Sequence, residues 1–433
     1  MTARTLLLVD GEHYPPVIED ALPHLRAAGR MPVAALFLGG FEKTDRPPHL
    51  GIPVVQGDPH ALMPGLIVEH QIDLVLDLSD EPVVDPRSRL RLAGQAMAAG
   101  AAYAGGGFEM TPPPRPRLAD LPTVSVIGTG KRTGKTGLSI ELARHWKAAG
   151  RHPCIVTMGR GGPPRPLVLR ADRLESPEVV LEELLERDLH ATSDYVEDAL
   201  FAGVDTVGTR RLGAGPAGVT VHDEFTAGVG AAVGLEPGML IYEGSGTAIP
   251  PAHSDATVLV TSTDIDPEFL TGYLGPFRLA VADALVVMGE PGDRLRRNIA
   301  RLAPDLAVFR AGLDPEPTTP VEGRRVVMVT TARPEAGGAI SSSLRRQGAR
   351  SVQTIHTLGD RRLLAADLTN LHRDDLVLTE VKAAAATVVL PEARQVGAEI
   401  GFVNNRVEIE GGTGTLAGLL ERRWQREPSL EAV

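Results

Sequence analysis

The segment Gly128-Thr129-Gly130-Lys131-Arg132-Thr133-Gly134-Lys135-Thr136 decides the fold of this chain. The apolar residues 123–127 precede it and predict a buried strand. After the segment, Leu138, Leu142 and Trp146 recur at helical spacing, which predicts an amphipathic helix. A strand, a glycine-rich loop ending in Gly-Lys-Thr, and a helix are the context that a phosphate-binding P-loop requires. Because backbone N–H groups and a helix N-terminus converge in such a loop, the segment predicts a nucleotide site.

The side chains of this loop have separate expected roles towards ATP and Mg²⁺, the two predicted cofactors. Lys135 is placed to bridge the β- and γ-phosphates, and the Thr136 hydroxyl is placed to reach the metal ion. The usual first glycine of such a loop falls on Thr129, with Gly128 one position earlier. The predicted cofactor-binding residues are Gly128, Thr129, Gly130, Thr133, Gly134, Lys135 and Thr136.

Two further cations, Lys131 and Arg132, lie inside the same loop. Only five of the 44 basic residues in the chain are lysines, so two lysines within five positions suggest a need for a compact ammonium group. We predict that Lys131 and Arg132 act with Lys135 as catalytic cations that face a second anion beside ATP. The alternative is that they form the solvated tip of an exposed loop.

A P-loop enzyme usually carries an acidic residue at the end of a neighbouring strand, where it orders Mg²⁺ and its water. Glu243 ends the predicted strand 239–242 at the carboxyl edge of the sheet. We predict that Glu243 is catalytic and that it binds the metal together with Thr136. Asp264 and Asp266 follow the next predicted strand and are the alternatives, although either aspartate can instead cap a helix N-terminus.

Arginines next to glycines predict a pocket for a highly charged substrate. Arg160 lies in Gly159-Arg160-Gly161-Gly162, and Arg210 and Arg211 precede the glycine-rich run 213–218. Arginine forks beside a glycine-rich backbone suit bidentate phosphate binding, whereas each arginine by itself has even odds of being an exposed loop residue. The run 213–218 fits Gly-x-Gly-x-x-Gly, but no apolar strand leads into it and Pro216 interrupts it, so it predicts no dinucleotide site.

A polar turn follows the first apolar strand of the chain. Asp10, Glu12 and His13 place two carboxylates and an imidazole at the carboxyl end of the predicted strand 6–9. Ligands of open α/β sheets bind at this edge. We therefore predict that these three residues bind substrate, together with Arg160, Arg210 and Arg211.

The alternation of strands and helices predicts an α/β fold with an N-terminal Rossmann-like domain, a P-loop NTPase-like parallel sheet domain and a C-terminal α/β extension. The predicted parts are residues 1–110 for the N-terminal domain, 111–121 for a proline-rich linker, 122–313 for the P-loop domain and 314–433 for the C-terminal region. Further predicted strands are 154–158, 257–261, 284–288 and 325–329. A second proline cluster, Asp314-Pro315-Glu316-Pro317, is interpreted as the separator before the last part.

Composition limits the classes of function. The 433-residue chain carries a net charge of −11, which argues against a general nucleic-acid or membrane-surface binder. No apolar run approaches the roughly 18 residues that span a bilayer. The single cysteine, Cys154, excludes an internal disulfide and a cysteine-based zinc site, and it fits a reducing compartment. We expect a cytoplasmic enzyme that binds neither nucleic acid nor membranes, and the sequence leaves a homodimer open.

The loop 128–136 resembles the P-loop of dethiobiotin synthetase and related small-molecule ligases. The chain as a whole resembles the cyclic 2,3-diphosphoglycerate synthetase family. The segments that carry this resemblance are Val9-Asp10-Gly11-Glu12-His13-Tyr14-Pro15-Pro16, 128–136, 158–162, 242–246 and 261–276. The turn after Val9 and the Lys-Arg pair inside the loop are the specific features, because Gly-Lys-Thr alone occurs in many P-loops.

This resemblance implies an ATP-dependent ligase that closes 2,3-bisphosphoglycerate into its cyclic anhydride and releases ADP and phosphate. The γ-phosphoryl group would pass to one substrate phosphate, and the neighbouring phosphate would then expel inorganic phosphate. Since the nucleophile is already an oxyanion, catalysis would rest on positioning and charge neutralisation. Two alternatives stay open: another ATP-dependent kinase or ligase acting on a small acidic phosphorylated substrate, and a P-loop ATPase switch that works through a partner.

Overall fold

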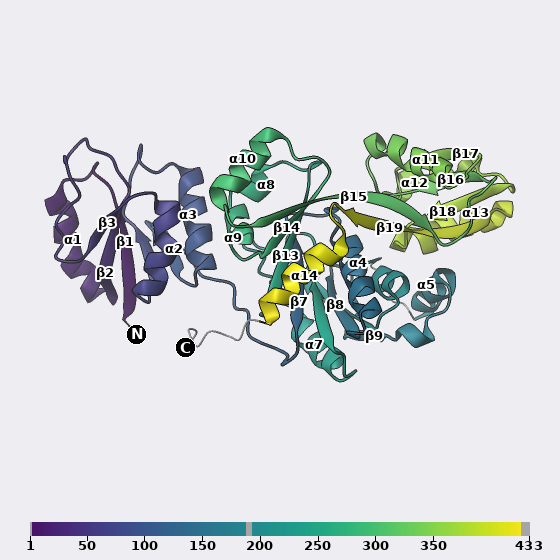
Figure 1. Cartoon of the computed structure of the whole chain (residues 1–433), viewed down its shortest axis with the longest axis horizontal. Coiled ribbons are helices and arrows are strands. Elements are labelled where there is room, and N and C mark those ends of the chain that lie inside the picture. The colour runs from purple at the N-terminus through teal and green to yellow at the C-terminus, as the bar shows by residue number, and fades with distance from the viewer. Residues whose placement is uncertain (1, 188–192, 426–433) are drawn as a thin grey trace.

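The computed structural model describes residues 2–187 and 193–425. Over these residues the chain forms two β-sheets, one of six strands and one of thirteen (Figure 1). Both sheets are mainly parallel and carry helices against them, so the predicted α/β fold class is confirmed. Among the described helices, none is long and apolar enough to cross a membrane.

The six-stranded sheet is formed near the N-terminus and has the order β3-β2-β1-β4-β5-β6. Its strands are β1 (Ala3–Val9), β2 (Arg30–Phe37), β3 (Val54–Gln56), β4 (Leu74–Asp77), β5 (Ala102–Gly105) and the antiparallel β6 (Phe108–Met110). Helices α1 (Pro15–Ala27), α2 (Pro59–Glu69) and α3 (Pro86–Ala98) connect them. Because β1 pairs with β2 on one side and β4 on the other, the topology changes direction at the carboxyl ends of β1 and β4.

The larger sheet has the order β11-β10-β8-β12-β7-β13-β14-β15-β19-β18-β16-β17, with β9 paired to β10. Its first half contains β7 (Thr123–Gly128), β8 (Pro153–Gly159), β9 (Leu167–Leu169), β10 (Thr206–Leu212), β11 (His222–Asp223), β12 (Met239–Glu243), β13 (Ala256–Ser262) and β14 (Ala284–Met288). We call this half, with its helices, the P-loop unit. Its helices are α4 (Lys135–Ala148), α5 (Pro177–Glu186), α6 (Ser193–Glu197), α7 (Phe225–Val233), α8 (Glu268–Thr271), α9 (Gly275–Ala280) and α10 (Asp293–Leu302).

The centre of the P-loop unit is β7, which lies between β12 and β13. The strands predicted at 123–127, 154–158, 239–242, 257–261 and 284–288 are confirmed as β7, β8, β12, β13 and β14. Their residues are buried on both faces, as in parallel sheets covered by helices. The predicted apolar face of α4 is also confirmed, since Leu138, Leu142 and Trp146 are fully buried. The P-loop therefore leaves a rigid strand and enters a firmly packed helix.

The second proline cluster, which was predicted to come before the C-terminal region, lies inside a strand that leads into that region. Pro315 and Pro317 belong to β15 (Ala307–Pro317), which pairs antiparallel with β19 (Glu399–Ile409). Beyond Ala311, β15 has no pairing with β14, and no strand of the described residues lies along that edge, where Gln347 Nε2 donates to Pro315 O. Thr318 donates its N–H to Phe402 O, which fixes the alternation and turns the N–H positions of both prolines to the edge without a strand. A strand tolerates proline at such an edge.

The long β15–β19 pair carries a second parallel group of strands, which we call the C-terminal lobe (Figure 1). The lobe contains β16 (Arg325–Val329), β17 (Ser351–Ile355) and β18 (Asp375–Thr379), with helices α11 (Gly337–Arg346), α12 (Arg361–Asp367) and α13 (Leu390–Val396). The chain then returns to the P-loop unit with α14 (Thr413–Trp424). There Trp424 packs against Trp146 at a ring-centroid distance of 5.6 Å, and Trp146 Nε1 donates to Glu421.

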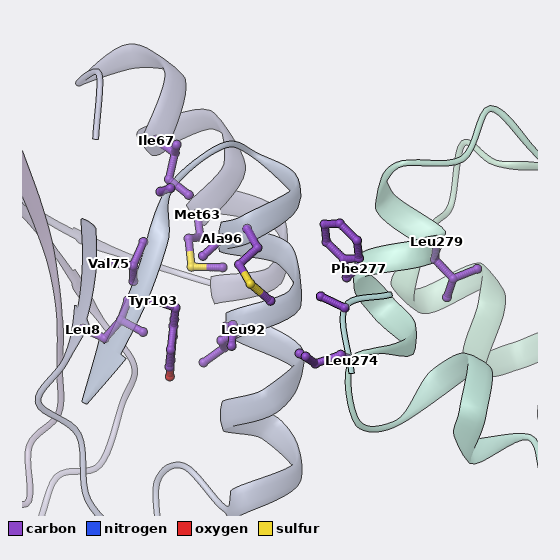
Figure 2. Packing of buried hydrophobic residues seen from close by; sticks show 14 of the residues in the cluster. Leu8, Met63, Ile67, Val75, Leu92, Ala96, Tyr103, Leu274, Phe277 and Leu279 are labelled. Atoms are coloured by element: carbon purple, nitrogen blue, oxygen red, sulfur yellow. The ribbon is translucent and has the colours of Figure 1, made fainter. Parts of the chain in front are cut away.

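The N-terminal sheet docks onto the P-loop unit through α3 and α9 (Figure 2). Leu92 and Ala96 of α3 belong to one apolar cluster with Leu274 and Phe277, which lie on the P-loop side. Gly94 allows the close approach, because a Cβ there would lie 3.0 Å from the Phe277 backbone nitrogen. The two sheets are thus joined by a continuous apolar core rather than by the 111–121 segment alone.

Candidate nucleotide and phosphate site

The P-loop folds back on itself so that Lys135 lies over it. Lys135 Nζ donates to Gly130 O at 2.8 Å and to Thr133 Oγ1 at 3.3 Å. A Cβ on Gly128 would lie 2.8 Å from Thr133 Oγ1 and 2.9 Å from Lys135 Cδ, so only glycine leaves room for this arrangement. Gly134 has a φ of +91°, in the left-handed region that glycine adopts without strain. The loop backbone and Lys135 are therefore arranged for an anion.

Lys135 is a buried cation with few fixed partners. Burial lowers its pKa to about 8, and the charges of Arg160 and Arg211 act in the same direction, whereas Glu243 and Asp194 oppose the shift. Nearby cations and desolvation both disfavour the ammonium form. A nucleotide phosphate placed against Nζ would restore the full positive charge.

The structure brings two predicted residues, Thr136 and Glu243, into direct contact. Thr136 Oγ1 donates to Glu243 Oε1 at 2.7 Å. Glu243 is the last residue of β12 and is 1% exposed, and its other oxygen, Oε2, lacks a hydrogen-bond partner among the described residues. Burial, followed by the charge of Asp194, raises the pKa of Glu243 to about 7. This buried carboxyl is poised to accept a cation.

Asp198 is a second buried carboxyl at this place, and the sequence analysis missed it. It follows α6 at the start of a π-helical turn, Asp198–Ala202, and is fully buried. No side-chain or backbone donor in the described part of the chain bonds to its carboxyl oxygens, and its close neighbour is the Glu243 carboxyl. Burial and then the neighbouring Glu243 raise its pKa well above the usual range. Asp194, Glu197 and Asp198 occupy positions i, i+3 and i+4, the helix-face spacing that could have pointed to it.

The oxygens at this point fit a hard divalent cation. Thr136 supplies a hydroxyl, and Glu243 and Asp198 supply buried carboxyl oxygens that lack partners. Magnesium prefers such oxygen ligands and usually takes only one or two carboxylates, the rest being substrate phosphates and water. The described residues contain no group of three or more His, Cys, Asp or Glu that could hold a metal ion by themselves.

The alternative acids, Asp264 and Asp266, lie after β13 and serve the local turn. Asp266 Oδ1 accepts the N–H of Glu268 at 2.9 Å, at the first residue of α8, and the Asp264 N–H is bonded to Ser262 Oγ. The hydroxyl of Thr136 points to Glu243 instead. The geometry therefore favours Glu243 as the acid beside the P-loop.

The three predicted arginines separate into two kinds. Arg211 and Arg160 flank Gly246, because a Cβ there would lie 3.3 Å from Arg211 Nη2 and 3.8 Å from Arg160 Nη2. Arg211 donates to Gly213 O and Ser245 O, and burial and then Arg160 lower its pKa. Arg210 instead donates Nε and Nη2 to the carbonyls of Pro163 and Gly162, 2.9 and 3.2 Å away, and so braces two loops. Of these three arginines, Arg160 and Arg211 are the two whose positive charges act on Lys135.

Lys131 and Arg132 lie at the exposed outer side of the loop. Arg132 has a φ of +60°, and its guanidinium reaches the C-terminal lobe, where a Cβ on Gly359 would lie 2.7 Å from Nη2. Loss of hydration, followed by the charges of Arg160 and Arg132, lowers the pKa of Lys131. The charges of Arg160 and Arg132 therefore act on Lys131, and the charge of Asp194 opposes them.

Asp10, Glu12 and His13 form a separate group on the N-terminal sheet. Asp10 Oδ1 contacts His13 Nδ1 at 2.7 Å and accepts the N–H of Glu12, while Oδ2 accepts the N–H of Asp80. Asp10 thereby ties the end of β1 to the segment after β4. The hydrogen bonds of this group stay on the N-terminal sheet, and those of Lys135 and Thr136 stay on the P-loop unit.

The sequence of this chain is similar to proteins of one family. The domain models of cyclic 2,3-diphosphoglycerate synthetase match residues 4–111 for the N-terminal domain, 123–303 for the P-loop domain and 317–406 for the C-terminal domain. The synthetase of that name from Rubrobacter xylanophilus is 42% identical over 96% of this chain and 97% of its own length.

More distant organisms carry relatives of the same name. The protein from Methanothermobacter thermautotrophicus is 36% identical over 95% of this chain and 93% of its own length. That from Thermococcus kodakarensis is 35% identical over 94% of this chain and 95% of its own length. With near full-length relatives and three domain models matched in chain order, this chain belongs to the cyclic 2,3-diphosphoglycerate synthetase family.

Proposed function

We propose that this chain catalyses the ATP-dependent closure of 2,3-bisphosphoglycerate to cyclic 2,3-bisphosphoglycerate, with release of ADP and phosphate. The observation that carries the proposal is the set of cations around Lys135, which exceeds what one nucleotide needs. Arg160 and Arg211 depress the pKa of Lys135, and Lys131 stands within electrostatic reach of Arg160. A substrate with two phosphates and a carboxylate would neutralise this charge.

The proposed reaction has two displacements at phosphorus. In the first, an oxygen of one substrate phosphate attacks the γ-phosphorus of ATP, and the bond to the β-phosphate oxygen breaks to release ADP. In the second, the neighbouring substrate phosphate attacks the phosphorus that now carries the transferred group, and inorganic phosphate leaves. Each nucleophile is an oxyanion, so the protein's task is to hold like-charged groups together.

The residues divide this task by position. Lys135 and the loop backbone would hold the β- and γ-phosphates, while Lys131 and Arg132 would stand between the γ-phosphate and the acceptor phosphate. Arg160 and Arg211 would hold the substrate, and the carbonyl-bonded Arg210 would keep their loops in place. Asp10, Glu12 and His13 remain a proposed substrate-binding group on the N-terminal sheet.

We propose Mg²⁺ as the metal cofactor, bound by Thr136 and Glu243 with Asp198 as a third contributor. The ion would supply Lewis-acid neutralisation of phosphate charge. Glu243 fixes the Thr136 hydroxyl through its Oε1 and keeps Oε2 available. We further propose that the reaction takes place in the cytoplasm, where the buried thiol of Cys154 stays reduced, and that the enzyme works alone or as a homodimer.

Phosphorus NMR of the protein with ATP, Mg²⁺ and 2,3-bisphosphoglycerate tests the proposed function. We expect the substrate resonances to be replaced by a cyclic anhydride signal as ADP and phosphate accumulate in equal amounts. A linear phosphorylated product without phosphate release would favour a kinase or ligase acting on another acid. ATP hydrolysis that 2,3-bisphosphoglycerate does not stimulate, but a macromolecule does, would favour a switch protein.

A further inference from the structure

The C-terminal lobe turns the carboxyl edge of its own parallel sheet towards the P-loop unit. The segments that follow β16, β17 and β18 lie at this edge, and two of them touch the P-loop unit. Gly359, after β17, lies against the Arg132 guanidinium. Lys382, after β18, places its Nζ 2.5 Å from Glu197 Oε2 of α6. The lobe is thus in contact with both the phosphate loop and the acidic helix beside it.

Hydrogen bonds hold the turn that carries Lys382 at this edge of the sheet. The neighbouring Glu380 accepts hydrogen bonds from Thr330 Oγ1 at 2.5 Å, Thr331 Oγ1 at 2.8 Å and Asn405 Nδ2 at 3.2 Å. These bonds fix the turn after β18 to β16 and β19. The Lys382 side chain is 25% exposed, and its partner Glu197 is 9% exposed. The Lys382 side chain therefore starts from a fixed turn and is partly exposed.

The charges around Lys382 connect it with the phosphate loop. Its positive charge contributes to lowering the pKa of Lys131, in addition to Arg160 and Arg132. Burial opposes the charged form of Lys382, but the charges of Glu197, Glu380 and Asp194 raise its pKa. Lys382 therefore stands between these carboxylates and the cations of the loop.

We propose that Lys382 is a substrate-binding residue that the C-terminal lobe contributes to the acceptor phosphate beside the P-loop. In the structure Glu197 accepts from the ammonium, and a substrate phosphate would replace this carboxylate as its partner. A phosphate offers more charge and more acceptor oxygens than one carboxylate. The identity of the acceptor in this assignment rests on the proposed function. The position of Lys382 would suit any small acid that carries more than one phosphate.

The competing explanation is an ion pair that only fastens the lobe to α6. The two explanations differ in what happens when Glu197 loses its charge. A fastening role predicts that Lys382→Gln and Glu197→Gln do similar harm, since each removes the same pair. A substrate-binding role predicts that they differ, because Glu197→Gln leaves Lys382 with a weaker competitor for its ammonium.

Isothermal titration of the full-length chain with 2,3-bisphosphoglycerate, in the presence of saturating ADP and Mg²⁺, tests this directly. For Lys382→Gln we expect affinity for 2,3-bisphosphoglycerate about 10- to 100-fold weaker, the loss expected for one charge-assisted contact. Lys382→Arg should recover part of it, and Glu197→Gln should bind as tightly as wild type or more tightly. Affinity for ADP, titrated separately, should stay within about twofold, less than 0.5 kcal/mol.

Lys147 provides the matched control. It lies at the far end of α4 from the P-loop, and its ammonium donates to Gly203 O. Lys147→Gln should leave both affinities unchanged. Equal weakening by Lys382→Gln and Glu197→Gln, or no weakening by Lys382→Gln, would overturn the assignment, as would a wild-type chain that does not bind the probe. If Lys382→Gln weakens the binding of a non-hydrolysable ATP analogue as much as the binding of 2,3-bisphosphoglycerate, Lys382 would contact the γ-phosphate instead. If wild type binds 2,3-bisphosphoglycerate but does not cyclise it, the proposed function fails while the Lys382 assignment is still judged by its variants.

Discussion

The hydroxyl of Thr136 and the carboxyl of Glu243 are joined by a 2.7 Å hydrogen bond that links the first turn of α4 to the end of β12. This bond leaves Glu243 Oε2 buried, without a donor among the described residues and close to the carboxyl of Asp198. Carboxyl groups that are desolvated and close to one another resist ionisation, which the raised pKa values of both residues express. A divalent cation bound there would favour the ionised form of both carboxyls.

Glu243→Gln should preserve the hydrogen bond to Thr136 and remove the charge that faces the metal. We expect Mg²⁺-dependent turnover to fall by about 100-fold or more, while nucleotide affinity measured without Mg²⁺ changes little. Turnover as a function of Mg²⁺ concentration, together with nucleotide titration, measures both effects. Asp264→Asn is the control. Full activity in Glu243→Gln with a damaged Asp264→Asn would mean that the acid lies after β13.

The raised pKa of Glu243 also predicts how stability depends on pH. Between the unfolded value of 4.5 and the folded value of about 7, the folded chain binds more protons than the unfolded chain. Stability therefore falls as pH rises through this window, by about 3 kcal/mol for a shift of this size. Glu243→Gln should remove that contribution, so its melting temperature relative to wild type should be higher at pH 8 than at pH 5. An identical difference at both pH values would contradict the assignment.

Lys135→Ala should separate binding from turnover. The alanine removes the ammonium that would follow the γ-phosphate, whereas the backbone of residues 128–134 still presents its N–H groups. We expect turnover to fall by about two to three orders of magnitude, as for other lost charge-stabilising donors, with a smaller loss of ADP affinity. Steady-state turnover and ADP titration measure the two quantities. A Lys135→Ala enzyme with near-normal turnover would refute the P-loop assignment.

The sequence was most informative where local pattern and local structure coincide. The P-loop could be predicted because β7, the loop and α4 are consecutive, and each has a spacing that identifies it. Glu243 could be selected because it ends an apolar run, and parallel strands end at one edge. Both inferences needed only neighbours in the chain and the topology of parallel sheets.

Other features depend on contacts that no local pattern carries. Asp198 is buried because α6 lies beside β8 and β10, whereas its sequence reads as an ordinary charged helix. That Pro315 and Pro317 lie in a paired strand could not be predicted, because a sequence does not reveal which edge of a strand lacks a neighbouring strand. The proximity of Lys382 to α6 depends on how the β15–β19 pair directs the lobe, over 185 residues of separation.

Variants of the outer cations of the loop test which ligand these residues contact, the substrate or ATP. Lys131 and Arg132 precede Gly134, on the side where the loop backbone would already satisfy the β-phosphate. Phosphates brought within about 4 Å of one another repel strongly unless cations intervene, so these two residues should act on the acceptor rather than on ATP. Lys131→Ala should therefore raise the KM for 2,3-bisphosphoglycerate and lower kcat, at a cost of a few kcal/mol at most, with little change in binding of an ATP analogue.

Arg132→Ala should have an additional effect, because its guanidinium contacts Gly359 of the C-terminal lobe as well as facing the acceptor. The comparison of Arg132→Ala with Arg132→Lys isolates this second role, since lysine keeps the charge but lacks the planar fork that lies against the glycine backbone. If both substitutions raise the substrate KM equally, the contact with the lobe matters more than the charge. If only alanine does so, the charge itself is required. Equal loss of ATP-analogue and substrate affinity in Lys131→Ala and Arg132→Ala would place the pair on ATP, and no loss for either ligand would make them the solvated loop tip.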